Sequence, residues 1–80
     1  MRIDKYLKNS RIIKRRTVAK ESCEQGRIEI NGRVAKPGSE VEPGDTVTIG
    51  FAAKEIKILV KAVPEHVTKE MAESMYEVIN

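Results

Sequence analysis

The chain has 80 residues, of which 40% are hydrophobic and 34% charged, with a formal net charge of +3. This length supports one small domain and leaves no room for a catalytic pocket beside a second module. The single cysteine excludes an internal disulfide and a cysteine-rich metal site, so we expect no metal, cofactor or catalytic residue. No apolar run approaches the about 18 residues of a membrane span, and no signal-peptide core is apparent, so we expect a cytoplasmic protein without a membrane partner.

Residues 3–8 predict a short helix. Ile3 and Leu7 stand four positions apart and share one face, with Tyr6 beside them. Asp4 falls in the first turn, where a negative charge suits the helix dipole. Tyr6 is expected to take a place in the core or at its rim rather than to stack on a base.

A second helix is predicted from an N-cap at Thr17 to Gln25. Gly26 follows where a left-handed residue commonly ends a helix. The inward stripe of this helix is predicted to consist of Val18, Ala19, Ser22 and Cys23. This position makes Cys23 a packing residue rather than a redox sensor.

After Gly26 the pattern changes to the alternation typical of strands. Residues 27–30 and 33–36 flank Asn31-Gly32, the preferred two-residue hairpin turn. Two more turns are predicted at Pro37-Gly38 and Pro43-Gly44-Asp45, and two more strands at residues 46–49 and 55–60.

The tail is expected to be helical. Pro64 is predicted to end the sheet region, and Thr68 to cap a helix over residues 68–79. The helical spacing rests on Met71, Met75, Val78 and Ile79. The predicted fold is therefore α+β, with two short N-terminal helices packed on a small antiparallel or mixed sheet and a helix at the C-terminus.

Positive charge is concentrated in the first part of the chain. Residues 1–36 hold eleven Lys and Arg against four acidic residues, a net charge of +7, whereas residues 37–80 carry four and eight, a net of −4. Fold stability favours interspersed charges, so this segregation indicates a polyanionic partner. The three aromatic residues are not grouped into a base-stacking platform, which favours folded RNA recognised by shape and phosphates.

The densest basic cluster is the run from Arg11 to Arg16, immediately before the second predicted helix. Cations near a helix start oppose its dipole and cost about 0.3–1 kcal/mol each. The same location offers free backbone N–H groups to a phosphate. A bound anion therefore makes both the nearby cations and the free N–H groups favourable. We predict a phosphate clamp of Arg16, Thr17 and the helix start, with Lys20 beside it. The residues proposed on this ground are Lys5, Lys14, Thr17 and Lys20.

Two other interpretations of the basic cluster explain the sequence less well. A solvated basic face without a partner is common, but it does not explain the acidic second half. Membrane attachment lacks the large apolar helix face that interfacial helices use. His66 has no Cys or His neighbour for a metal site, and no Ser has an accompanying His for nucleophilic catalysis.

Several motifs together resemble the S4-type RNA-binding domain of ribosomal proteins. The matching residues are Arg2-Ile3-Asp4-Lys5-Tyr6-Leu7, Ser10-Arg11, Arg15-Arg16-Thr17 with Ala19, Gly26-Arg27-Ile28, Asn31-Gly32, Lys36, and Val41 with Pro43-Gly44-Asp45. The resemblance covers about residues 1–50, within a single domain spanning residues 1–80. It implies that the helix pair and the following turn, the αL motif, present a basic surface to RNA. The family positions carried over to this chain are Arg2, Arg11, Arg15 and Arg16.

Within that family the chain is similar to small free-standing members related to the fifteen-kilodalton heat-shock protein. It departs from the heat-shock protein itself in lacking a long basic C-terminal extension. The resemblance implies a monomer that binds rRNA and peptidyl-tRNA on stalled large ribosomal subunits. It also implies support for the partner RqcH in adding C-terminal alanine tails. An alternative is a factor for assembly or rRNA stabilisation on empty large subunits. A domain appended to an RNA-modifying enzyme is disfavoured because 80 residues hold no catalytic body.

Overall fold

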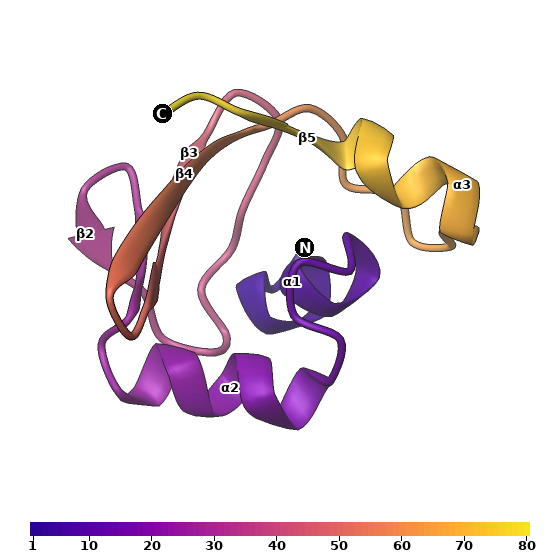
Figure 1. Ribbon diagram of the computed structural model, residues 1–80. Helices are drawn as coiled ribbons and strands as arrows, with labels where there is room; N and C mark the ends of the chain where they lie inside the picture. The colour runs from indigo at the N-terminus through magenta and orange to yellow at the C-terminus, as the bar shows by residue number, and fades with distance from the viewer.

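The computed structural model describes residues 1–80 and has two helices packed against one face of an antiparallel sheet (Figure 1). The elements in chain order are α1 (Ile3–Asn9), α2 (Arg16–Glu24), β1 (Ile28–Ile30), β2 (Arg33–Val34), β3 (Thr46–Phe51), β4 (Lys54–Val60), α3 (Lys69–Ala72), a 3-10 turn (Glu73–Met75) and β5 (Tyr76–Val78). The strand order is β2-β1-β3-β4-β5, and every neighbouring pair is antiparallel. The predicted α+β class is confirmed.

The core lies between the helices and one face of the sheet. The register places Ile30, Val47 and Ile58 side by side across β1, β3 and β4, so that they point to the same face. Ile3, Tyr6 and Leu7 of α1 and Ala19 and Cys23 of α2 are buried against this face. The alternation in the strands and the apolar stripes of the helices therefore meet in one hydrophobic cluster.

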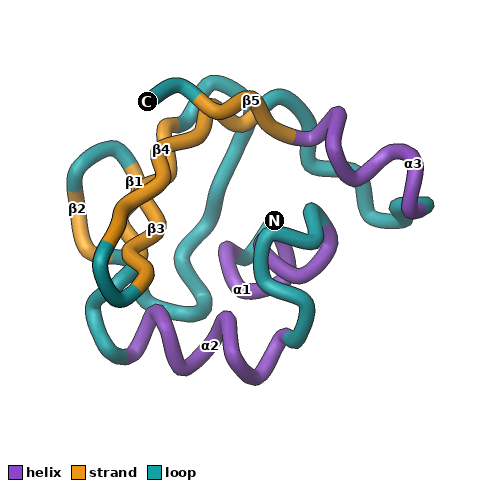
Figure 2. The backbone as a smooth tube through the Cα atoms, in the orientation of Figure 1, coloured by secondary structure: helices purple, strands orange, loops and turns teal.

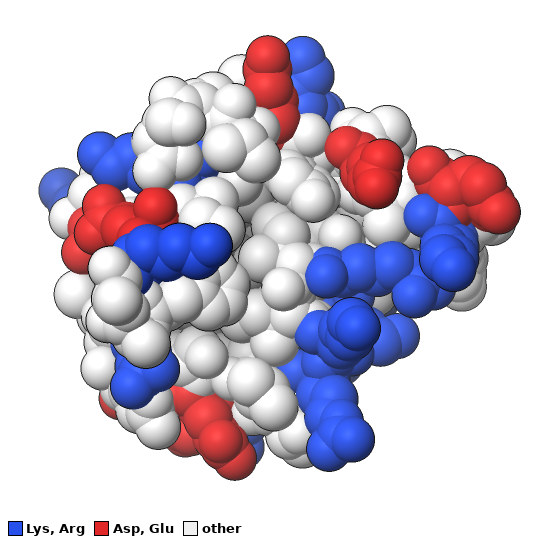
Figure 3. All heavy atoms as spheres, in the orientation of Figure 1, with Lys and Arg blue, Asp and Glu red and all other residues white.

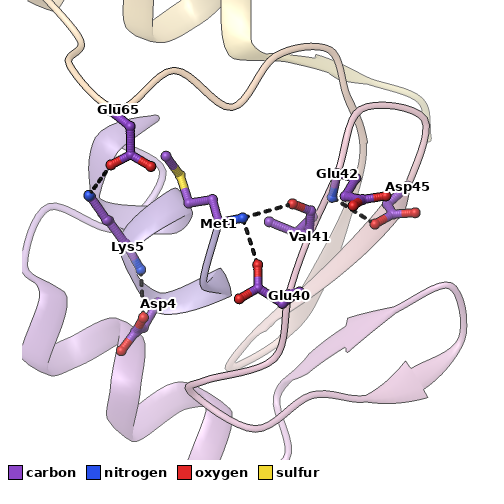
Figure 4. Close-up of polar contacts among 8 residues, drawn as sticks. All are labelled: Met1, Asp4, Lys5, Glu40, Val41, Glu42, Asp45 and Glu65. Carbon is purple, nitrogen blue, oxygen red and sulfur yellow. Dashed lines mark hydrogen bonds and ion pairs between the residues drawn. The ribbon is translucent and has the colours of Figure 1, made fainter.

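The connection from β2 to β3 (Figure 2) is hydrogen-bonded to the start of α1. The backbone N–H of Ile3 donates to the carbonyl of Ser39 at 2.8 Å, and the N–H of Val41 donates to the carbonyl of Met1 at 2.9 Å. The amino group of Met1 also pairs with Glu40 at 2.7 Å (Figure 4). The first of these bonds satisfies an N–H of the first turn of α1 that the helix itself leaves unpaired, and the other two hold the N-terminus against the connection.

The prediction of Thr17 as the N-cap of α2 is wrong. The helix begins at Arg16, and the N-cap is Arg15 in an extended conformation, without a side-chain cap hydrogen bond. The carbonyl of Arg15 accepts the N–H of Ala19 at 3.0 Å, so Thr17 already lies inside the first turn. Val18, predicted to face inward, is 44% exposed. The predicted end is confirmed, since Gly26 has a φ of +75° just after the helix.

The predicted Asn31-Gly32 hairpin is confirmed. Both residues have positive φ, at 52° and 83°, as the two central residues of a type I′ turn require. The Asn31 side chain also donates to Asp45 at 3.1 Å and accepts the N–H of Thr46 at 2.9 Å. Asn31 therefore joins the hairpin to the Pro43-Gly44-Asp45 turn in addition to shaping its own.

The predicted helix over residues 68–79 is wrong in its second half. Thr68 caps α3 as expected, accepting the N–H of Met71 at 3.3 Å, but the helix ends at Ala72. Residues 76–78 instead form β5 on β4, where Val60 faces Tyr76 and Ile58 faces Val78. Pro64 therefore does not end the sheet. The reason is tertiary: without β5 the edge of β4 exposes unpaired N–H and C=O groups, and no helical contact offsets that cost.

The predicted packing role of Cys23 is confirmed. Burial raises the pKa of the Cys23 thiol to about 11, with the Asp4 and Glu24 charges adding to the effect, so Cys23 is an inert packing residue. His66 is exposed. Met75 is fully buried, whereas Met71 is 42% exposed. No helix has the length and apolar character needed to cross a membrane.

Tyr6 links α1 to the C-terminal segment. Its side chain is fully buried, and its hydroxyl donates to the carbonyl of Met75 at 2.8 Å. Burial, with the Tyr76 charge beside it, raises the pKa of this phenol, so the group remains a neutral donor. The predicted core position of Tyr6 is confirmed.

We predict that Tyr6→Phe lowers the free energy of unfolding by about 1 kcal/mol, because it removes one buried hydrogen bond without opening a cavity. Urea unfolding monitored by circular dichroism measures the difference. The Met75 carbonyl keeps the N–H of Lys61 at 2.8 Å as a second donor, so a loss well above this value is not expected. Unchanged stability would show that the bond contributes nothing.

Candidate nucleic-acid interface

All the predicted RNA-contacting residues lie on one stretch of surface formed by α1, the loop after it and the start of α2. Lys and Arg side chains gather there, on the side of the molecule between α2 and α3 (Figure 3). The set comprises Arg2, Lys5, Arg11, Lys14, Arg15, Arg16, Thr17 and Lys20, of which only Lys5 is partly buried. The fold thus brings the whole set to one side of the molecule. Some of these cations form ion pairs with acidic residues of the protein, and others do not.

A buried carboxylate holds two of the predicted arginines. Asp4 is 2% exposed, and its side chain accepts the backbone N–H of Lys5 at 2.8 Å. Its other oxygen pairs with Arg2 at 3.0 Å and with Arg16 at 3.6 Å. Both arginine side chains remain 49% exposed. Asp4 therefore fixes the two guanidinium groups on α1 and α2 while leaving part of each available to an outside anion.

Lys5 is also paired, with Glu65 of the segment before α3, at 2.6 Å (Figure 4). The hydrogen bond and charge of Lys5 lower the pKa of the Glu65 carboxyl. Because Glu65 lies at the surface, an exposed ion pair of this kind contributes little to stability. Lys5 is therefore a weaker candidate than the cations without an acidic partner.

Five cations of this surface form no ion pair. Four of them, Arg11, Lys14, Arg15 and Lys20, were predicted from the sequence, and the fifth is Lys8 at the end of α1. Lys8 is not among the residues predicted from the sequence. The available signal is its place three residues after Lys5 on α1, a spacing that brings two side chains to the same face of a helix. We refer to Lys8, Arg11, Lys14, Arg15 and Lys20 as the unpaired cations.

The start of α2 has the electrostatic character expected of an anion site. Its first turn contains no acidic residue, and its N-cap supplies no side-chain acceptor. The positive end of the helix dipole, the free N–H groups and the cations therefore add together rather than offset one another. The Thr17 hydroxyl is exposed within that turn and has no hydrogen-bond partner in the protein.

Arg11 adopts a backbone conformation that favours glycine. Its φ is +64°, at the left-handed position just after α1, where its N–H donates to the Lys8 carbonyl at 3.1 Å. A residue with a Cβ costs roughly 1–2 kcal/mol in this conformation. The helix end requires the left-handed turn, but nothing in the folding of the chain requires an arginine there.

Three of the unpaired cations border two hollows of the surface. Lys8, Asn9, Arg11 and Lys14 line one with Val67, and Arg11 also lines a second one against α3. A third hollow lies at the turn from β3 to β4, where Arg27 and Lys54 face Glu55. That third hollow is apart from the cationic surface and contains a compensating acid, so we assign it no part in the interface.

Known proteins share both the motifs and the fold. Residues 1–47 match the model of the S4 domain. The chain is 55% identical over 78 residues to the RQC P-site tRNA stabilizing factor of Halalkalibacterium halodurans, covering 98% of this chain and 89% of the relative. It is 49% identical to the Bacillus subtilis protein of the same name, covering 99% and 92%. The trimeric structure of Vibrio cholerae heat shock protein 15 superimposes with a TM-score of 0.90 at 29% identity, covering 99% of this chain and 81% of that one.

The class that fold and motifs define is the S4-domain protein, because the matching residues span both helices, the hairpin and the turn before β3. Within that class the chain belongs to the family of RQC P-site tRNA stabilizing factors (RqcP), which is related to heat shock protein 15. The resemblance noted in the sequence is confirmed at both levels.

We predict that Asp4→Ala lowers the free energy of unfolding by about 2 kcal/mol, because it leaves the Lys5 N–H and two guanidinium groups without their acceptor. Asp4→Asn keeps an oxygen for the Lys5 N–H and is expected to lose less. Chemical denaturation gives both values. Glu40→Ala is the control, since Glu40 is 71% exposed and its ion pair should contribute less than about 0.5 kcal/mol. Equal effects of Asp4→Ala and Glu40→Ala would contradict the role given to Asp4.

We predict that Arg11→Gly moves stability and RNA affinity in opposite directions. Glycine relieves the positive φ, so the free energy of unfolding should stay level or rise by up to about 1 kcal/mol. The same change removes an unpaired cation and should weaken RNA binding about tenfold. Thermal unfolding and an RNA-binding titration on one protein preparation measure the two quantities. A parallel loss of both would show that Arg11 is a structural residue.

Proposed function

We propose that this protein is a non-catalytic RNA-binding factor that stabilises tRNA on large ribosomal subunits during ribosome-associated quality control. The observation that carries the proposal is the group of five unpaired cations beside the uncapped start of α2. The names of the relatives, each an RQC P-site tRNA stabilizing factor, supply the RNA and its location.

The mechanism needs no bond to be made or broken. A small cationic domain that contacts ribosomal RNA and tRNA at the same time raises the residence time of the tRNA. It takes the place of subunit joining, which would otherwise hold the tRNA. Differential affinity for one state of a cycle is sufficient to shift the population toward it. In this proposal Asp4 holds Arg2 and Arg16 in place, and these two arginines orient the surface toward the RNA. The unpaired cations neutralise phosphates.

The finer parts of the proposal concern partners and place. We propose that the protein acts in the cytoplasm as a monomer and supports RqcH-dependent addition of alanine tails to the stalled chain. Affinity purification of the tagged protein tests the partner: large subunits with tRNA and RqcH support the proposal, whereas precursor rRNA on empty subunits favours an assembly factor. Light scattering distinguishes a monomer from a trimer such as that of the Vibrio cholerae protein.

Charge reversal at Arg15 tests the surface without weakening the fold. Arg15 is exposed and unpaired, and a carboxylate at the start of a helix is favourable by about 0.3–1 kcal/mol. We predict that Arg15→Glu keeps or raises stability but lowers co-sedimentation with large subunits carrying peptidyl-tRNA at least tenfold (on the order of one charged hydrogen bond). Lys54→Glu makes the same charge change on an exposed, unpaired residue at the β3–β4 turn and should bind almost normally.

The salt dependence adds a quantitative check to the same experiment. Five neutralised phosphates predict a slope of log affinity against log salt of roughly −3 to −5, and Arg15→Glu should reduce its magnitude by about one. Binding that does not change with salt, or equal losses for Arg15→Glu and Lys54→Glu, would contradict phosphate neutralisation by this surface.

A further inference from the structure

Two hollows lie next to each other along the seam between the α1–α2 loop and the segment that contains α3. The first, which we call the cationic pocket, has a volume of about 190 Å³ and is lined by Lys8, Asn9, Arg11, Lys14 and Val67. The second, the Tyr76 cleft, has a volume of about 460 Å³, and its polar lining comprises Ser10, Arg11, Lys69, Glu70, Glu73 and Tyr76. Arg11 lines both hollows.

The cationic pocket has the chemistry of a phosphate site. Three of its five lining residues are cations, none of them is ion-paired, and no carboxylate lines the pocket. The Asn9 amide adds a neutral donor. Its volume falls below the about 300–1,000 Å³ typical of sites for whole small molecules, so it suits one compact anion rather than a nucleoside.

The Tyr76 cleft is mixed in charge, because Arg11 and Lys69 line it together with Glu70 and Glu73. Glu70 and Glu73 repel a phosphate, but carboxylates accept hydrogen bonds from the exocyclic amines of bases. Tyr76 is partly buried and provides the aromatic surface on which unstacked bases pack in RNA-binding proteins. The volume of the cleft lies in the range for a small-molecule site.

Arg11 connects the two hollows at an energetic cost. Its left-handed backbone, with φ of +64°, directs an unpaired guanidinium to the boundary between them, where glycine would form the same turn without strain. Strained residues of this kind are concentrated at ligand sites. A cation at the boundary contacts a phosphate on one side and stacks or hydrogen-bonds with a base on the other.

We propose that the seam binds one unpaired nucleotide of the RNA, with its phosphate in the cationic pocket and its base in the Tyr76 cleft. This inference rests on the proposed function and identifies the RNA feature that the surface recognises. A base inside an A-form helix is stacked and unavailable, so the site selects a bulged or loop nucleotide. The two glutamates favour adenine, cytosine and guanine, which carry amino groups, over uracil.

The experiment compares two RNA hairpins that differ only by one bulged adenosine, using the full chain. We expect the bulged hairpin to bind at least tenfold more tightly, as one charged hydrogen bond and one stacked base suggest. A bulged uridine should bind less tightly than the adenosine. Equal affinity for bulged and fully paired hairpins overturns the inference but leaves the proposed function standing, whereas absence of binding to either hairpin overturns both.

Variants separate the two halves of the site. Glu73→Gln should reduce the preference for bulged adenosine over bulged uridine about tenfold, while affinity for the paired hairpin stays level or rises. Lys8→Gln should weaken both bulged hairpins equally. Glu55→Gln is the matched control, since Glu55 is an exposed residue of β4 outside the seam, and it should change nothing. Indistinguishable behaviour of Glu73→Gln and Glu55→Gln overturns the assignment of the base to the Tyr76 cleft.

Nuclear magnetic resonance titration with adenosine monophosphate and with inorganic phosphate provides a direct readout. Phosphate alone should shift amide signals of residues 8–14, and adenosine monophosphate should shift those and the signals of residues 69–76. Identical shift patterns for the two probes overturn the inference. This result does not depend on any variant folding correctly.

Discussion

The buried carboxylate of Asp4 is the contact on which the rest of the interface depends. A charge that is 2% exposed requires partners of opposite sign, and this one obtains them from Arg2 and Arg16 and from the N–H of Lys5. One group therefore ties the start of α1 to the start of α2. Because each arginine keeps half of its side chain exposed, the same contact that stabilises the helix pair also fixes where two positive charges face solvent.

Pairing divides the positive surface into two kinds of cation. Arg2, Lys5 and Arg16 are held by acids of the protein, so their positions are set before any ligand arrives. The unpaired cations have no such acids, and their mutual repulsion, the uncapped start of α2 and the left-handed Arg11 all raise the free energy of the free protein. In the proposed complex an RNA phosphate lowers the first two of these costs, whereas the backbone strain at Arg11 remains. In the proposed function the preorganised cations supply orientation and the uncompensated ones supply affinity.

The C-terminal segment contributes to both the fold and the surface. Through β5 it covers the edge of β4, and through the carbonyl of Met75 it accepts the hydroxyl of Tyr6 from α1. The same contacts bring α3 and Tyr76 against the loop that follows α1, so residues more than sixty positions apart line one cleft. The high identity to the stabilizing factors extends over 98% of the chain, which includes this segment as well as the S4 match.

Local chemistry in the sequence determined the helix pair, the Asn31-Gly32 hairpin and the side of the chain that carries positive charge. These features depend on neighbouring residues: apolar spacing in α1, positive φ at the hairpin, and eleven cations within the first 36 positions. Tertiary structure decided the rest. Residues 76–78 became a strand because β4 offered hydrogen bonds, and α2 begins at Arg16 with Arg15 as its extended N-cap. Neutralisation of Arg16 and Lys5 depends on the approach of Asp4 and Glu65 in space, and no local pattern specifies those distances.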